Sequence, residues 1–131
     1  MIVLDTHAWV WWVNSPKLLS RPALSSVERA AKHHELFVAT ISAWELAMLV
    51  EKGRLELTMD VRDWIARCET LPFLSFVPLS TAIAVESVRL PDFPNQDPAD
   101  RIITATAMSL GAGLVTKDSR LLHYGNVKTI W

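Results

Sequence analysis

The sequence is poor in the residues that build disulfides and cysteine-based metal sites. Its single cysteine, Cys68, can form no disulfide within the chain and supplies no CxxC metal clamp. This use of cysteine is typical of a reducing compartment, so we expect a cytoplasmic location. No apolar run approaches the ~20 residues that cross a bilayer, and the acid at Asp5 comes too early for a secretory signal. We therefore expect a soluble protein with no membrane partner.

The sequence also lacks an excess of either charge. Thirteen Lys and Arg residues against fourteen Asp and Glu residues give a formal net charge of −1. This balance excludes a general electrostatic attraction to nucleic acids or anionic membranes, so contact with a nucleic acid needs a local basic cluster or a bound cation. Half of the 131 residues are hydrophobic, which predicts one folded domain over residues 1–131 with a sizeable core.

Short apolar segments alternate with helix-like segments along the chain. We expect strands over residues 2–4, 36–40, 76–79, 113–116 and 127–131. We expect helices over residues 6–13, 22–34, 42–53, 61–68, 81–88, 98–110 and 119–123. This alternation predicts an α/β domain with a mostly parallel sheet of about five strands. The third strand should lie near an edge, because Pro78 cannot donate a hydrogen bond to a neighbouring strand.

One helix start carries more acid than packing requires. Asp97 is a good N-cap, since its side chain can accept a hydrogen bond from a free amide of the first turn. Pro98 suits the first helical position, where its missing N–H costs nothing. Asp100 lies in the first turn, where the positive end of the helix dipole favours a carboxylate. The cap accounts for one carboxylate, and the second needs another reason.

Three further acids are expected at the same edge of the sheet as Asp100. Asp5 and Asp118 each follow a strand, and Glu45 lies in the first turn of the helix after the second strand. Ligands bind at the carboxyl ends of parallel strands, where these four carboxylates should meet. Like charges at close range cannot all stay ionised unless a cation joins them. Carboxylates without a Cys or His cluster suit hard ions such as Mg²⁺ or Mn²⁺.

Each acid also has a purely structural interpretation. Glu45 completes the pattern Ser42-x-x-Glu45 of a capping box. Asp118 can cap the turn that follows it, and Asp100 can simply complement the helix dipole. Asp5 is the hardest to explain in this way, because a carboxylate that closes a buried strand is costly without a partner. The set of four is therefore more specific than any one of its members.

Other conspicuous side chains are basic or aromatic. The candidates for contacts with a phosphate backbone adjoin the acids in sequence and are Arg101, Lys117 and Arg120. His7 has no second histidine at metal-binding spacing, so we expect a structural role. Five tryptophans are expected mainly in the core or in interfaces, with base stacking as the alternative. They are Trp9, Trp11, Trp12, Trp44 and Trp64.

Four stretches together resemble the four motifs of the PIN-domain nucleases, and their order and spacing are most similar to the VapC-like toxins of bacterial toxin–antitoxin pairs. They are Leu4-Asp5-Thr6-His7-Ala8-Trp9, Ser42-Ala43-Trp44-Glu45, Asp97-Pro98-Ala99-Asp100-Arg101-Ile102-Ile103-Thr104-Ala105-Thr106-Ala107 and Leu114-Val115-Thr116-Lys117-Asp118. The resemblance covers essentially the whole chain. It implies a PIN-like three-layer α/β/α fold and a Mg²⁺- or Mn²⁺-dependent endoribonuclease, usually a homodimer, that a small antitoxin holds inactive.

The same resemblance assigns roles to individual residues. Carried over to the matching positions, the metal-binding and catalytic acids are Asp5, Glu45, Asp100 and Asp118. Thr6 and Thr116 are the supporting residues that the resemblance implies, and Asp97, which is expected to be a helix cap, is a further supporting residue. Such a site hydrolyses RNA with metal-activated water and leaves a 5′-phosphate and a 3′-hydroxyl.

Two other classes of function fit parts of the sequence. In a non-catalytic interaction module the tryptophans form an interface and the acids are only helix caps. A phosphoryl-accepting signalling domain also uses an acidic, Mg²⁺-binding sheet edge, but neither residues 36–40 nor residues 76–79 end in the required aspartate. A haloacid-dehalogenase-type phosphatase needs a second Asp two residues after the first, where His7 stands.

Overall fold

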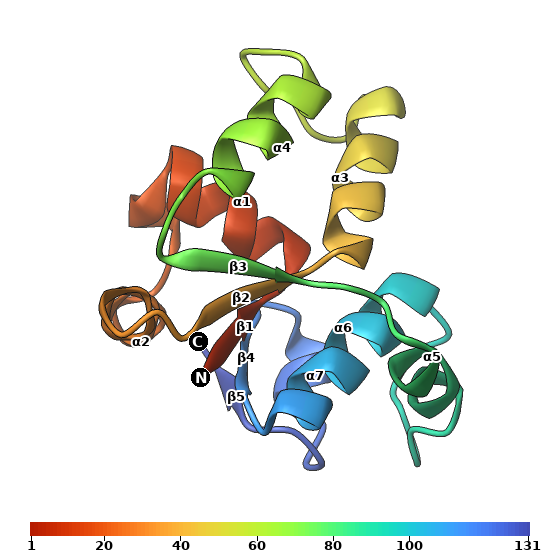
Figure 1. Ribbon diagram of the computed structural model, residues 1–131. Helices are drawn as coiled ribbons and strands as arrows, with labels where there is room; N and C mark the ends of the chain where they lie inside the picture. Colours follow the sequence, from red (N-terminus) through yellow and green to blue (C-terminus); the bar gives the residue numbers. More distant parts are fainter.

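A five-stranded sheet forms the middle layer of the protein (Figure 1). The structure is a computed structural model that describes every residue from Met1 to Trp131. The strands are β1 (Ile2–Leu4), β2 (Leu36–Ala39), β3 (Leu74–Val77), β4 (Gly113–Val115) and β5 (Thr129–Ile130). They are arranged in the order β3-β2-β1-β4-β5, and every neighbouring pair is parallel. The expected α/β architecture with a parallel sheet is confirmed.

Seven α-helices form the outer layers. They are α1 (Thr6–Asn14), α2 (Arg21–Lys32), α3 (Ile41–Glu51), α4 (Val61–Glu69), α5 (Thr81–Val88), α6 (Pro98–Leu110) and α7 (Ser119–Leu122). A 3-10 turn, Pro16–Leu18, links α1 to α2. Helices α1, α2 and α4 cover one face of the sheet, α6 and α7 cover the other, and α5 packs against α6 (Figure 1). No helix combines the length and the apolar character needed to cross a membrane.

The core consists of two hydrophobic clusters, one on each face of the sheet. In the central strand, Ile2 and Leu4 contribute to the first cluster and Val3 to the second, as the alternation of side chains along a strand requires. Trp9 is fully buried in the first cluster, where its ring lies 5.0 Å from that of Trp64. The core role expected for these two tryptophans is therefore confirmed. Trp44 differs, because it is 54% exposed.

Four strands have different bounds from those predicted. Two differ by one residue, since β2 ends at Ala39 rather than at residue 40 and β4 ends at Val115 rather than at residue 116. β3 begins at Leu74, which pairs with Leu36, and it ends at Val77. Pro78 follows the strand because it has no N–H to donate, and β3 does lie at an edge of the sheet. The last strand is limited to two residues, Thr129 and Ile130, rather than residues 127–131, since only these pair with β4.

Candidate metal centre

The carboxyl ends of the strands open on an acidic cavity of about 470 Å³. The structure brings into its wall all four acids predicted to carry the chemistry, which come from four separate places in the sequence. The lining residues are Asp5, Thr6, His7, Trp11, Glu45, Asp97, Asp100, Lys117 and Asp118. The parallel sheet accounts for this convergence, because β1 and β4 are neighbours and the helices after β1 and β2 start at the same edge.

Asp5 joins the end of β1 to the start of α1. Its backbone N–H donates to the Val115 carbonyl of β4 (3.0 Å), and its side chain caps α1 by accepting from the Ala8 amide (2.8 Å). Burial raises the pKa of Asp5, although the Thr116 hydroxyl and the Ala8 amide oppose the shift. The ionised form of this carboxylate is therefore costly unless a positive charge lies beside it.

The start of α6 holds Asp97 and Asp100 close together. One oxygen of Asp97 accepts from the amides of Ala99 (2.8 Å) and Asp100 (3.2 Å), so the predicted cap is present. Asn95 ties the two acids to each other. Its side-chain N–H₂ donates to Oδ2 of Asp100 (3.1 Å), and its Oδ1 accepts from the Asp97 amide (2.8 Å). Asn95 was absent from the sequence-based site, although an Asn two residues before an N-cap is a typical turn former.

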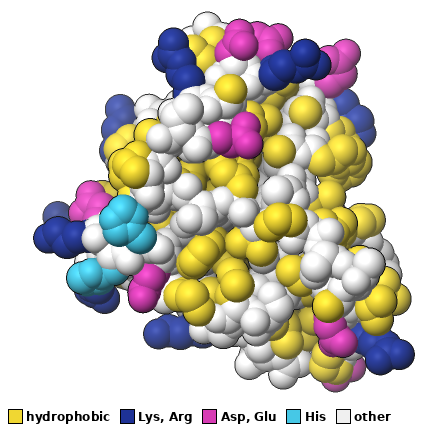
Figure 2. Space-filling view, viewed as in Figure 1, with side chains coloured by type: hydrophobic (Ala, Val, Ile, Leu, Met, Phe, Trp, Pro, Cys, Tyr) yellow, Lys and Arg dark blue, Asp and Glu magenta, His cyan; other side chains and the backbone are white.

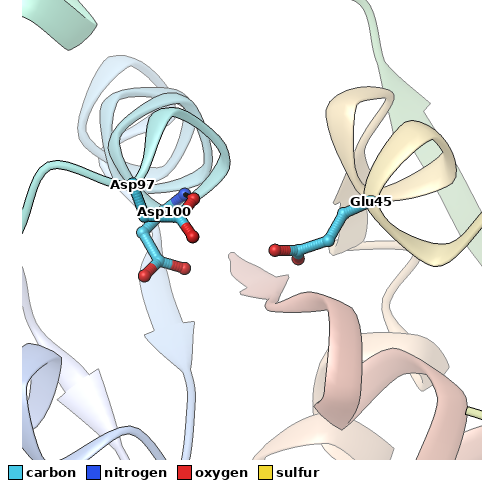
Figure 3. A group of neighbouring side chains, drawn as sticks. All are labelled: Glu45, Asp97 and Asp100. Atoms are coloured by element: carbon cyan, nitrogen blue, oxygen red, sulfur yellow. Dashed lines mark hydrogen bonds between the residues drawn. The ribbon is translucent and has the colours of Figure 1, made fainter. Parts of the chain in front are cut away.

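Glu45 approaches these two acids from α3 (Figure 3). One oxygen each of Glu45, Asp97 and Asp100 lie within 4.8 Å of one another. We call these three residues the acid triad. The triad includes Asp97, which the sequence indicated only as a cap and a supporting residue.

The capping-box interpretation of Glu45 is wrong. The N-cap of α3 is Thr40, in the αR conformation and without a side-chain cap bond, so the helix begins earlier than expected. Ser42 lies inside the helix and is fully buried, and its hydroxyl accepts a hydrogen bond from Thr6 Oγ1 (3.0 Å). This bond ties α3 to α1, and Glu45 points toward α6 instead of back to a cap (Figure 3).

Asp118 forms a salt bridge with the neighbouring Arg120. It caps α7 by accepting from the Arg120 amide (2.9 Å), and the Arg120 guanidinium donates to both of its oxygens (3.0 and 3.3 Å). The Arg120 side chain holds the pKa of Asp118 below its usual value. The side chain of Arg120 is 56% exposed, so it can move away from Asp118 at little cost.

The electrostatics of the acid triad favour a cation. Burial is the main reason that the pKa of Asp100 is raised to about 7, followed by the charges of Asp97 and Glu45. All donors are carboxylate oxygens, and no Cys or His belongs to the triad. Such a set fits a hard divalent ion and does not suit a soft one.

The remaining predicted residues fall into two groups. Lys117 lines the cavity, and Thr116 lies fully buried behind it, where its hydroxyl accepts from the Asp118 amide (3.1 Å). Arg101 does not line the cavity. It donates to the Ser87 carbonyl (3.2 Å) and lies over the Phe93 ring at 5.1 Å, so its position fixes α6 against α5.

Known proteins share both the sequence and the fold. The chain matches the PIN domain family over residues 2–127. It is 38% identical over 132 residues to Ribonuclease VapC22 of Mycobacterium tuberculosis, which covers 99% of this chain and 98% of that protein. The fold is similar to that of VapBC2 from Rickettsia felis bound to a promoter DNA fragment, with a TM-score of 0.71, 18% identity, and coverage of 98% of this chain and 97% of that chain. The fold is also similar to that of FitAcB from Neisseria gonorrhoeae, with a TM-score of 0.66 and 18% sequence identity. That match covers 98% of this chain and 96% of that chain. These structures support the three-layer α/β/α architecture.

Proposed function

This chain belongs to the PIN-domain family and is a metal-dependent endoribonuclease of the VapC-like toxins, and we propose that Asp5, Glu45, Asp100 and Asp118 hold its cation. The observation that carries this proposal is the convergence of these four carboxylates in the wall of one cavity, where oxygens of Glu45 and Asp100 lie within 4.8 Å of each other. Mutual repulsion and burial at this spacing make the ionised carboxylates unfavourable alone and favourable around Mg²⁺ or Mn²⁺. The family match over residues 2–127 supports treating residues 1–131 as one PIN domain.

The four acids and their neighbours have separate tasks in this proposal. A bound divalent cation lowers the pKa of a water molecule and neutralises the charge that builds on the scissile phosphate. Asn95 holds one oxygen of Asp100, which leaves the other free for the cation. Asp97 keeps the start of α6 in place and adds negative charge beside Asp100. Thr6 in the wall of the cavity and Thr116 behind it support the site, since both are buried next to its acids.

The basic residues of the cavity rim are proposed to meet the RNA backbone. Lys117 lines the cavity, and the exposed Arg120 can exchange Asp118 for a phosphate. Arg101 is the weakest of the three predicted contacts, because its guanidinium already binds the Ser87 carbonyl. Hydrolysis by water at this site is expected to leave a 5′-phosphate and a 3′-hydroxyl.

The protein partners follow from the family and from one surface. A small antitoxin is the proposed inhibitor, as the similar complexes named VapBC suggest, and the cytoplasm is the proposed location.

Hydrophobic side chains gather over α3 and α5 on the right of the molecule in Figure 2. The large hydrophobic residues that these two helices expose are Trp44 on α3 (54%) and Val85 and Val88 on α5 (51% and 78%). We propose that a second copy of the chain binds this face. Light scattering of wild type and Val88→Lys tests this homodimer, and a monomeric wild type would refute it.

Cleavage assays with matched variants test the proposed reaction. Asp100→Asn and Glu45→Gln should each lower the rate of single-stranded RNA cleavage by at least about 100-fold, since each removes a cation ligand. Asp60→Asn is the control, because Asp60 also caps a helix but lies outside the cavity. Wild-type cleavage should stop in EDTA, return with Mg²⁺ or Mn²⁺, and give 5′-phosphate ends. Cleavage that continues in EDTA, or full activity of Asp100→Asn, would refute the proposal.

A further inference from the structure

The acidic cavity has one aromatic wall. Trp11 is the only hydrophobic residue that lines it, beside His7 and Lys117. His7 and Trp11 are four residues apart on α1 and therefore share a helix face, with ring centroids 5.7 Å apart. The ring of Trp131 lies 5.9 Å from that of Trp11, and the Lys117 ammonium lies 5.8 Å from its centroid, over the ring.

This wall differs from the other aromatic side chains of α1. Trp9 is fully buried in the core, and Trp12 packs edge-on against Phe73 (5.6 Å) without lining the cavity. Trp11 is half-buried, so part of its indole is open to a ligand. Contacts with His7 and Trp131 restrict its rotamers before any ligand arrives, which lowers the entropy cost of binding.

The charges of the cavity make such a wall useful. Five acids line the cavity, whereas Lys117 is the only Lys or Arg that does. A phosphodiester is therefore repelled by most of the wall in the absence of a cation, and the net charge of −1 adds no attraction at long range. Stacking of a base on an aromatic ring does not depend on charge and tolerates any base.

We propose that Trp11 is the stacking surface for one unpaired base of the RNA, adjacent to the phosphate that is cut; this inference rests on the proposed ribonuclease activity. In the free protein the Lys117 ammonium lies over the ring. When RNA binds, the base takes that position and the exposed lysine moves to a neighbouring phosphate. A base within a duplex has both faces covered by stacking, so this geometry selects single-stranded or loop RNA.

An abasic scan tests the proposal on a protein that keeps Trp11. Binding of a fluorescent single-stranded RNA is measured by anisotropy in the Asp100→Asn background, which keeps the RNA intact, and one base at a time is replaced by an abasic ribose. Loss of the stacked base should weaken binding by about tenfold at one position next to the cleavage site. If no position near the cleavage site matters, Trp11 does not stack a base.

Variants of Trp11 complete the test and separate it from the test of the activity. Trp11→Ala should raise KM for single-stranded RNA by about tenfold and should lose the sensitivity to the abasic position. Trp11→Phe keeps an aromatic face, so it should keep a KM near that of wild type and most of the sensitivity to the abasic position. Trp12→Ala is the matched control on the same helix. Metal-dependent cleavage with equal KM for the Trp11→Ala and Trp12→Ala proteins would overturn the stacking role alone. Failure of wild type to cleave RNA with metal would overturn the proposed activity instead.

Discussion

At the scale of single residues, the site is a set of carboxylates whose negative charges repel one another when no cation is bound. The pKa of Asp100 rises to about 7 and that of Asp5 also rises, in both cases mainly because burial disfavours the charged form. Asp118 behaves in the opposite way because Arg120 stabilises its charge. Of these three acids, only Asp118 has a basic side chain beside it that outweighs the effect of burial.

The pH dependence of stability follows from Asp100. Its folded pKa of about 7 lies above its ordinary value of 3.8, so the folded state binds this proton more tightly than the unfolded state does. The ionised form of Asp100 therefore lowers the free energy of unfolding. This loss is absent at a pH below the ordinary pKa and grows as the pH rises through the folded pKa. The melting temperature of the metal-free protein in EDTA should therefore increase from pH about 8 to about 5.5. Asp100→Asn should flatten this slope and Asp60→Asn should not; equal slopes in all three proteins would contradict the account.

Asn95 gives a second prediction at this scale. Asn95→Ala removes the donor to Asp100 and the acceptor of the Asp97 amide. A hydrogen bond to a charged group contributes about 1.5–3 kcal/mol, so Mn²⁺ affinity should fall by about tenfold or more. The affinity is measured from the dependence of the melting temperature on Mn²⁺ concentration. Asn126→Ala is the control, since its side chain donates to Tyr124 instead; equal Mn²⁺ affinity in both variants would exclude the positioning role.

At the scale of secondary structure elements, the buried Thr6–Ser42 bond sets α3 against α1. This contact has a direct consequence for the site, because Thr6 follows Asp5 and Ser42 lies one turn before Glu45. Its two hydroxyls lie 36 residues apart in sequence. The spacing Ser42-x-x-Glu45 suggested a cap because it is a local pattern, while the true partner of Ser42 is set by the packing of two helices.

Unfolding in denaturant tests this bond. Ser42→Ala leaves the Thr6 hydroxyl buried without its partner and should cost about 1–3 kcal/mol of unfolding free energy. Replacing both groups, in Thr6→Val with Ser42→Ala, removes the unsatisfied hydroxyl and should recover most of that loss. A double variant whose loss equals the sum of the two single losses would show that the bond does not couple the helices.

At the scale of the whole molecule, sequence reasoning predicted the features that depend on local patterns. The alternation of apolar runs and caps predicted the parallel sheet, and the ends of its strands predicted where Asp5, Glu45, Asp100 and Asp118 meet. Contacts between distant segments were not predictable in the same way. The pairing of Trp11 with Trp131 joins residues from opposite ends of the chain, and no periodicity signals it.

The same limit applies to details of the site that depend on side-chain geometry. Arg120 was a candidate phosphate ligand, and its position two residues after Asp118 did not reveal that it binds both oxygens of that acid. Asp97 was expected as a cap, but the approach of α3 to α6 also makes it a member of the acid triad. Packing of separate elements therefore decided what local spacing left open.

Thermal unfolding of wild type and Asp5→Asn, each in EDTA and in Mn²⁺, tests the central claim most directly. Asn caps a helix as well as Asp does, so the variant keeps the bond to Ala8 and loses only the charge. Without metal, Asp5→Asn should melt higher than wild type, because burial disfavours the ionised Asp5. Mn²⁺ should then raise the melting temperature of wild type strongly and that of the variant little. If Asp5→Asn melts lower than wild type and Mn²⁺ moves neither protein, the acids form no cation site.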